Sequence, residues 1–174
     1  MKIIKRLAAL LFALILMISS AQAEWKAAGK NNRRPAGSEG SCMAEFKTLE
    51  EAREFFELDR FATENSITLE ELSEGRSVCK LVLGFRHRNA EGGVMGGAIL
   101  TLIDFAFATA ASNMHRPTVA QQVSMNFLNS VRGRVLTAEA TCRKDGRTSC
   151  VYQVNVKDDL DRDIAQAVMT GFKL

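Results

Sequence analysis

The sequence predicts a single α+β domain in which an antiparallel sheet curves around one long, buried helix. Residues Val94–Ser112 contain almost no polar side chains, and their length and Ala/Leu/Ile content favour a helix that is covered on most sides. The last third of the chain alternates apolar and polar residues with a period of two, as half-buried strands do. A length of 174 residues suits one domain, and we find no internal repeat and no second domain.

The first 23 residues have the pattern of a secretory signal peptide. A positively charged start is followed by the apolar run Leu7–Ile18, which is too short to span a membrane, and by the cleavage pattern Ala21-Gln22-Ala23. We therefore expect export with cleavage after Ala23, a linker over residues 24–44 and a folded domain over residues 45–174. A start of translation at Met43 is the alternative, and it implies a cytoplasmic protein.

Two further elements are predicted before the long helix. Apolar residues recur on one helical face within Thr48–Phe61, where Thr48 and Glu51 resemble a capping box. Ile67–Phe85, with Gly75 in its middle, indicates either one long or bent strand or the two arms of a hairpin. The polar, glycine-containing residues His87–Gly93 are typical of a loop.

The C-terminal third of the sequence predicts several strands that pair antiparallel. Asp145-Gly146 is a strong hairpin turn signal, and the polar residues Asp158–Asp163 indicate another turn. The predicted strands are Val119–Phe127, Val135–Cys142, Ser149–Val156 and Ile164–Phe172.

Composition narrows the class of protein. A net charge of +3 without a basic stripe gives no reason to expect a nucleic-acid partner, and we expect no membrane partner. The four cysteines lack metal-binding spacing and there are only two histidines, so we expect neither a metal nor a cofactor.

Cys142 and Cys150 flank the predicted hairpin turn. They either face each other or, in the interpretation that we favour, are small core residues.

Asp104 is a lone carboxylate within the apolar helix. A buried carboxylate is costly unless it is paired or faces a cavity, and the residues one turn away are uncharged. Asp104 therefore either has a structural role or faces a functional cleft.

Gly96 and Gly97 stand where this helix is predicted to begin. The first N–H groups of a helix have no internal acceptor and can bind a developing oxyanion, although glycines there can also serve close packing. Gly97 and Asp104 are seven residues apart and so lie near one helical face. Asn89, just before the helix, is either a turn former or a group that holds a carbonyl or a water. Together these residues suit the activation of water against an acyl carbonyl.

The stretch "HRNAEGGVMGGAILTLIDFAFATAA" (residues 87–111) resembles the signature of hotdog-fold thioesterases of the PaaI/4HBT type. That signature contains H-x-N, a glycine, H-G-G and L-x-D in order. Its counterparts here are His87-Arg88-Asn89, Gly92, Gly96-Gly97 and Leu102-Ile103-Asp104. The resemblance extends over about residues 46–174, and "VSMNFLNSV" (residues 123–131) is similar to the strand that follows the central helix.

The resemblance implies a hotdog fold, which is an antiparallel sheet of five or six strands wrapped around the helix. It also implies a homodimer or homotetramer with the active site at the subunit interface, where Asn89 comes from one chain and Asp104 from the other. The substrate would be an acyl-CoA or another thioester. Asp104 would act as general base or nucleophile, the amides of Gly96 and Gly97 would polarise the carbonyl, and Asn89 would orient the carbonyl or the water.

The resemblance also suggests substrate-contacting residues. Gln122 falls where related enzymes place a polar group near the water, and His87 belongs to the H-x-N. Met95 replaces the usual His before the Gly-Gly pair, which removes an imidazole and favours an apolar acyl or aryl group, or a lower rate.

Two other functions remain open at this stage. A non-catalytic hotdog protein that binds acyl groups or acyl-CoA is the first. A hydratase, with His87 and Asp104 as the acid–base pair, is the second. Export conflicts with an acyl-CoA substrate, which is cytoplasmic.

Overall fold

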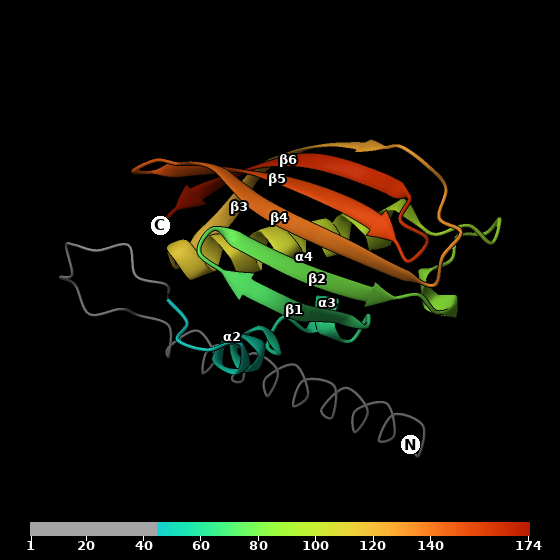
Figure 1. Cartoon of the computed structure of the whole chain (residues 1–174), viewed down its shortest axis with the longest axis horizontal. Coiled ribbons are helices and arrows are strands. Elements are labelled where there is room, and N and C mark those ends of the chain that lie inside the picture. The colour runs from blue at the N-terminus through green and yellow to red at the C-terminus, as the bar shows by residue number, and fades with distance from the viewer. Residues whose placement is uncertain (1–44) are drawn as a thin grey trace, which may run out of the picture. The chain divides into compact units, whose positions relative to one another are not determined.

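The structure is a computed structural model, and it describes residues 45–174. Within this range a long helix, α4 (Gly96–Met114), lies against one face of a curved six-stranded sheet (Figure 1). This architecture confirms the predicted α+β hotdog fold. The predicted signal peptide (residues 1–23) and linker (residues 24–44) lie outside the described residues.

The helix predicted over residues 48–61 is two helices, α2 (Leu49–Phe56) and α3 (Arg60–Thr63), so the prediction of one unbroken helix is wrong. Asp59 lies at the N-cap of α3, where its side chain makes no capping hydrogen bond, and Asp is unfavourable in a helix interior. The capping interaction is confirmed at the start of α2, where the Thr48 hydroxyl accepts a hydrogen bond from the Glu51 N–H at 3.1 Å. The break allows both helices to pack beside β1.

The hairpin alternative is confirmed for the next segment. Strands β1 (Ile67–Ser73) and β2 (Arg76–Val82) pair antiparallel, and Gly75 has a φ of +65° in the turn between them. Glycine adopts this conformation without strain, and a Cβ there would lie 2.9 Å from the Cβ of Cys142. A short 3-10 helix, η1 (Phe85–His87), and a loop then lead to α4.

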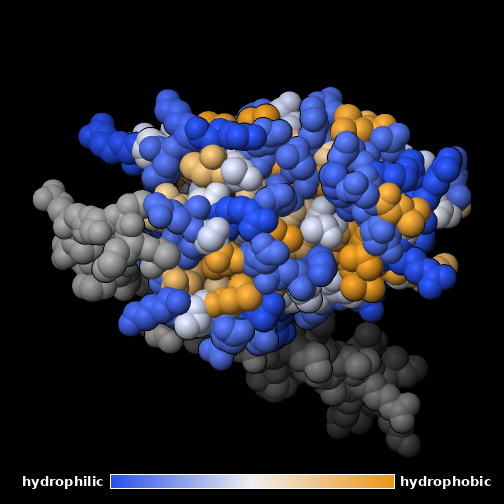
Figure 2. All heavy atoms as spheres, viewed as in Figure 1, coloured by the Kyte–Doolittle hydropathy of each residue, from blue (hydrophilic) through white to orange (hydrophobic). Residues whose placement is uncertain are grey.

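The remaining strands follow α4, and the sheet has the order β1-β2-β4-β5-β6-β3 with every pair antiparallel. The strands contribute many buried side chains to the core, whereas the viewed surface is mainly hydrophilic with separate apolar patches (Figure 2). The strands are β3 (Thr118–Phe127), β4 (Val135–Asp145), β5 (Ser149–Asp158) and β6 (Asp163–Lys173).

The core forms where α4 packs on the sheet. The rings of Phe107 and Tyr152 meet edge to face, with centroids 5.5 Å apart. By length and composition α4 is apolar enough to cross a membrane, but most of it is buried against the strands, as in the core helix of a soluble domain.

In the β4–β5 pair, Cys142 lies opposite Tyr152 and Cys150 lies opposite Asp145, so the two cysteines are not opposite each other. Both are free, and Cys150 is a core residue.

The two edges of the sheet differ. The β1 edge lies beside α2 and α3, whereas β3 forms the other edge and is exposed along most of its length. Val119, Val123 and Phe127 on β3 are 40–55% exposed. A long edge strand with exposed apolar side chains is typical of an interaction surface.

Candidate active site on the open face of α4

One face of α4 is not covered by the sheet. Gly97, Leu100, Thr101 and Asp104 share this face, because each is three or four residues from two others of the set. Gly97, Leu100 and Asp104 are exposed. The expectation that the helix buries Asp104 is therefore wrong for the single chain. The reason is that the curved sheet covers only one side of the helix.

Asp104 borders a hollow of about 390 Å³, here called the Asp104 hollow. Phe61, Leu100 and Thr101 also line it. Partial burial raises the pKa of the Asp104 carboxyl, and the negative charge of Asp59 raises it further. Within residues 45–174 the carboxylate has no hydrogen-bond or ion-pair partner, so it is available to take up a proton.

Two glutamines of β3 lie in the same hollow as Asp104. Gln122 is the one expected from the sequence, and its side-chain oxygen accepts a hydrogen bond from Thr170 at 3.5 Å. Gln121 was not expected. The structure brings it there through a bulge, since β3 pairs with β6 through Ala120 and Gln122 and leaves Gln121 as the extra residue. A bulge redirects side chains, and period-two alternation gives no sign of it.

The start of α4 presents free backbone donors. The N–H groups of Gly96 and Gly97 find no acceptor in the described part of the chain, and Met95 at the N-cap has no side-chain cap. These N–H groups carry the positive end of the helix dipole and suit an anion or a carbonyl oxygen. A Cβ on Gly96 would lie 2.8 Å from the Phe127 ring, so glycine is needed for this close approach.

Asn89 shapes the loop before α4. Its side-chain oxygen accepts hydrogen bonds from the N–H groups of Glu91 (3.1 Å) and Gly93 (2.9 Å). Asn89 and Gly96 border a second hollow of about 520 Å³, the Asn89 hollow, which is separate from the Asp104 hollow. A single chain therefore does not place Asn89 and Asp104 in the same hollow.

His87 is buried, and both of its ring nitrogens are engaged. Nδ1 accepts a hydrogen bond from the Gly84 N–H at 2.8 Å, which leaves Nε2–H to donate to the Asn65 carbonyl at 2.9 Å. His87 thus holds the loop, and neither nitrogen is free to serve the acid–base pair of a hydratase. Beside it lies an apolar cavity of about 360 Å³, here called the Met95 cavity, which Met95 and Gly97 also line.

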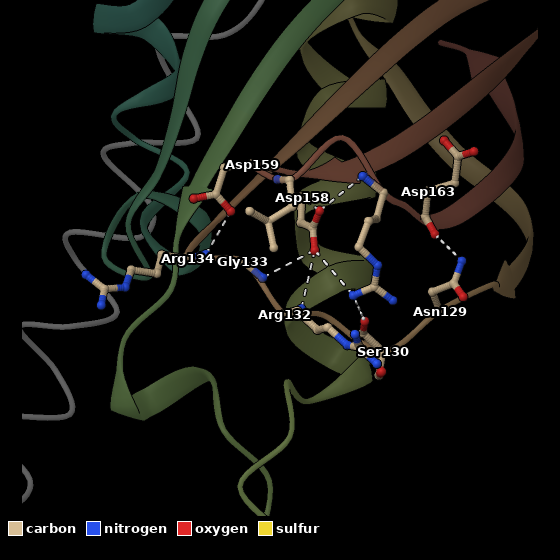
Figure 3. A network of polar contacts seen from close by, with 10 residues as sticks. Asn129, Ser130, Arg132, Gly133, Arg134, Asp158, Asp159 and Asp163 are labelled. Atoms are coloured by element: carbon tan, nitrogen blue, oxygen red, sulfur yellow. Dashed lines mark hydrogen bonds and ion pairs between the residues drawn. The ribbon is translucent and has the colours of Figure 1, made fainter.

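A network around Asp158 fixes the segment that follows β3 (Figure 3). One carboxylate oxygen of Asp158 accepts from the N–H groups of Arg132 (3.3 Å) and Gly133 (3.2 Å), and the other accepts from Leu160 and Arg162 (both 3.1 Å). Burial alone would raise the pKa of Asp158, but these four hydrogen bonds outweigh it and lower the pKa.

The Asp158 network matters for the site because the segment it holds is one wall of the Asn89 hollow. Asn129 and Ser130 line that hollow, and they are tied to the β5–β6 turn. The Asn129 amide donates to the Asp163 carbonyl at 2.8 Å, and Arg162 donates to the Ser130 carbonyl at 3.0 Å. The sequence indicated only a polar turn here.

Among residues 45–174, no group of three or more His, Cys, Asp or Glu side chains is arranged to hold a metal ion.

Comparison with known proteins agrees with the fold. The sequence pattern of the family described as Thioesterase superfamily (4HBT) matches residues 91–165. A protein of Archaeoglobus fulgidus that is assigned as an esterase is 30% identical over 105 residues, which cover 60% of this chain and 68% of the relative. The acyl-coenzyme A thioesterase PaaI of Escherichia coli is 27% identical over 120 residues, which cover 68% of this chain and 86% of the relative.

Solved structures agree as well. A hypothetical thioesterase of Streptococcus pneumoniae, crystallised with coenzyme A, superposes with a TM-score of 0.64 at 28% identity and covers 68% of this chain and 94% of its own. The chain therefore belongs to the thioesterase superfamily, with the hotdog fold of the PaaI type. This membership places it, in general terms, among hydrolases of thioesters and esters.

Proposed function

We propose that this protein hydrolyses acyl-CoA thioesters, with Asp104 as the catalytic carboxylate. The observation that carries the proposal is the open face of α4, where an unpaired carboxylate with a raised pKa and free N–H groups at the helix start are both accessible. The carboxylate can activate water, and the N–H groups can stabilise the oxyanion of the tetrahedral intermediate.

The reaction follows from these groups. The thioester oxygen accepts hydrogen bonds from the N–H groups at Gly96 and Gly97. Asp104 takes a proton from water, whose oxygen bonds to the carbonyl carbon. The tetrahedral intermediate then expels the thiolate, which takes up the proton, and a carboxylic acid and a free thiol result. Direct attack by the Asp104 carboxylate is the alternative first step. Gln122 steadies the water.

The spacing along α4 supports a site shared by two subunits. Gly97 and Asp104 are seven residues apart, which is about 10 Å along a helix and too far for both to act on one carbonyl. Antiparallel pairing of two α4 helices about an axis at Leu100 and Thr101 places Gly97 of one chain opposite Asp104 of the other. Asn89 would then face Asp104 of the partner subunit, although the two occupy different hollows of one chain.

The edge strand β3 supports the same dimer. Its exposed apolar residues and unpaired backbone would join the β3 of a second copy, which would extend the sheet across both subunits. The same pairing would cover the open face of α4 and further desolvate Asp104. A homodimer, alone or within a homotetramer, is therefore part of the proposal.

The similar proteins favour coenzyme A thioesters as the substrate class. The Escherichia coli relative is an acyl-CoA thioesterase, and the Streptococcus pneumoniae structure contains coenzyme A. If residues 1–23 direct export, the substrate is another thioester or an ester outside the cytoplasm.

The test is thiol release by the full chain and its Asp104→Asn variant from short, medium-chain and aryl acyl-CoA substrates. We expect turnover by the native protein and loss of turnover in the variant, with the same melting temperature for both. Equal turnover by both proteins would remove Asp104 from the mechanism.

A non-catalytic acyl-CoA-binding protein is the second candidate, because Met95 provides no imidazole at the start of α4. Binding of acyl-CoA by the native protein without any thiol release would establish that function instead.

A further inference from the structure

The Met95 cavity and the Asp104 hollow open on the same face of α4. Phe61, Leu100 and Thr101 line both, and Gly97, whose N–H is free, lines the Met95 cavity. The cavity therefore begins beside a backbone donor that the proposed mechanism uses for the carbonyl oxygen. A group attached to that carbonyl carbon would be next to the cavity.

The polar side chains around the Met95 cavity already make hydrogen bonds within the protein. His87 uses both ring nitrogens, and the Thr101 hydroxyl donates to the Gly97 carbonyl at 2.9 Å. Arg86, which is exposed, donates to the Glu64 carbonyl at 2.5 Å. The rest of the lining is mainly apolar: Phe61, Ile67, Leu81, Met95, Ala98 and Leu100. Such a lining favours an apolar occupant, since it offers a charged or hydroxylated end few partners.

Phe61 is the one lining residue contributed by α3. Its ring is 73% exposed in the single chain, while its neighbour Ala62 is buried and anchors α3. The side-chain amide of Asn65 donates to the Phe61 carbonyl at 2.7 Å, which fixes the backbone at this position. A large apolar ring held at the mouth of an apolar cavity gains contact area when an apolar group enters.

We propose that Phe61 is a specificity-determining residue, and that the Met95 cavity takes the apolar alkyl or aryl part of the acyl group. In this arrangement the acyl chain lies against Phe61 and Met95, while its carbonyl oxygen accepts from the Gly97 N–H of the same chain. Asp104 of the partner subunit acts on the carbonyl carbon. The inference rests on the proposed thioesterase function and adds the substrate class, which is thioesters with apolar acyl groups longer than acetyl.

The first experiment measures binding and requires no hydrolysis. The full chain is titrated with S-ethyl-CoA and S-octyl-CoA, which are thioethers that cannot be hydrolysed. We expect the octyl compound to bind at least about tenfold more tightly, since each buried methylene contributes to affinity. In Phe61→Ala the ratio of octyl to ethyl affinity should fall about fivefold, because the ring that covers the alkyl group is lost. An equal affinity for both thioethers in the native protein would overturn the proposal.

The matched control is Leu58→Ala. Leu58 is 77% exposed, lies between α2 and α3, and does not line the Met95 cavity. Its substitution should leave the octyl-to-ethyl ratio unchanged. A ratio that falls equally in both variants, or in neither, would show that Phe61 does not select the acyl group.

The second experiment compares kcat/KM for octanoyl-CoA and acetyl-CoA. Phe61→Ala should lower the octanoyl-to-acetyl ratio of kcat/KM about fivefold or more. The two proposals fail in different ways. Hydrolysis that depends on Asp104 but has an unchanged ratio overturns only the role of Phe61. An alkyl-dependent affinity without any thiol release overturns the thioesterase and supports the acyl pocket.

Discussion

Gly96 at the start of α4 lies so close to the Phe127 ring of β3 that a Cβ on Gly96 would be 2.8 Å from the ring's far carbon. This contact joins the helix start, which carries the free N–H groups, to the edge strand of the proposed dimer. Both residues line the Asn89 hollow. The position of the ring thus depends on the absence of a side chain at residue 96.

Gly96→Ala should change activity more than stability. Phe127 is 55% exposed and its ring can move, so the added methyl should alter the free energy of unfolding by less than about 1 kcal/mol. The displaced ring would enter the Asn89 hollow or the dimer interface, and we expect kcat/KM to fall about tenfold. Chemical denaturation and steady-state kinetics measure the two effects.

The double variant Gly96→Ala/Phe127→Leu is the control for this steric explanation. The smaller side chain makes room for the methyl group, so the double variant should recover most of the activity relative to Phe127→Leu alone. An additive loss in the two substitutions would show that the contact between them is not the cause.

Asp104→Asn should reduce kcat by at least about a hundredfold, because a positioned general base contributes that much or more. The carboxylate has a raised pKa, so its charged form is disfavoured in the folded protein, and removal of the charge should not lower the melting temperature at neutral pH. Kinetics and thermal unfolding of the same preparation check this. A large loss of stability would mean that Asp104 has a structural role.

Asp59→Asn should shift the acid limb of the pH–rate profile to lower pH. Desolvation and the negative charge of Asp59 both raise the pKa of Asp104, so removal of that charge lowers the pH at which Asp104 ionises. The shift should be larger at low salt, because dissolved ions screen the charge of Asp59. Glu64→Gln, which removes an acidic charge at the other end of α3, should leave the limb in place.

The hotdog architecture was predictable because its signals are local. Apolar content over nineteen residues marks α4, and alternation marks β4 and β5. Asp104 stood out as the one carboxylate in an apolar segment. The exposed position of Asp104 was not predictable, because it depends on how far the sheet curves around the helix. The bulge that presents Gln121 and the break at Asp59 were also missed, since both depend on tertiary packing that periodicity does not encode.

Asp158→Asn should destabilise the protein at neutral pH and remove part of its acid sensitivity. The four N–H donors lower the pKa of Asp158, so its stabilising contribution is present above the pKa of the unfolded chain and is lost as pH falls through the folded value. An asparagine has only one acceptor oxygen, which leaves two donors unmatched. The difference in melting temperature between native protein and variant should therefore be largest near neutral pH and shrink below about pH 4.

Asp161→Asn is the matched control for Asp158→Asn. Asp161 lies in the same turn with a φ of 57°, which Asn tolerates, and its ion pair with Lys157 is exposed. We expect little change in stability at any pH. A loss as large as that of Asp158→Asn would show that the turn, rather than its hydrogen bonds, is sensitive.

The proposed active site is built by two chains, with Asn89 from one and Asp104 from the other. The most direct test mixes Asn89→Ala and Asp104→Asn subunits, each inactive alone, after unfolding and refolding them together. Each mixed dimer would contain one intact site, so an equal mixture should recover about a quarter of native thiol release from acyl-CoA. A mixture as inactive as its components, with mixed dimers present, would contradict a shared site.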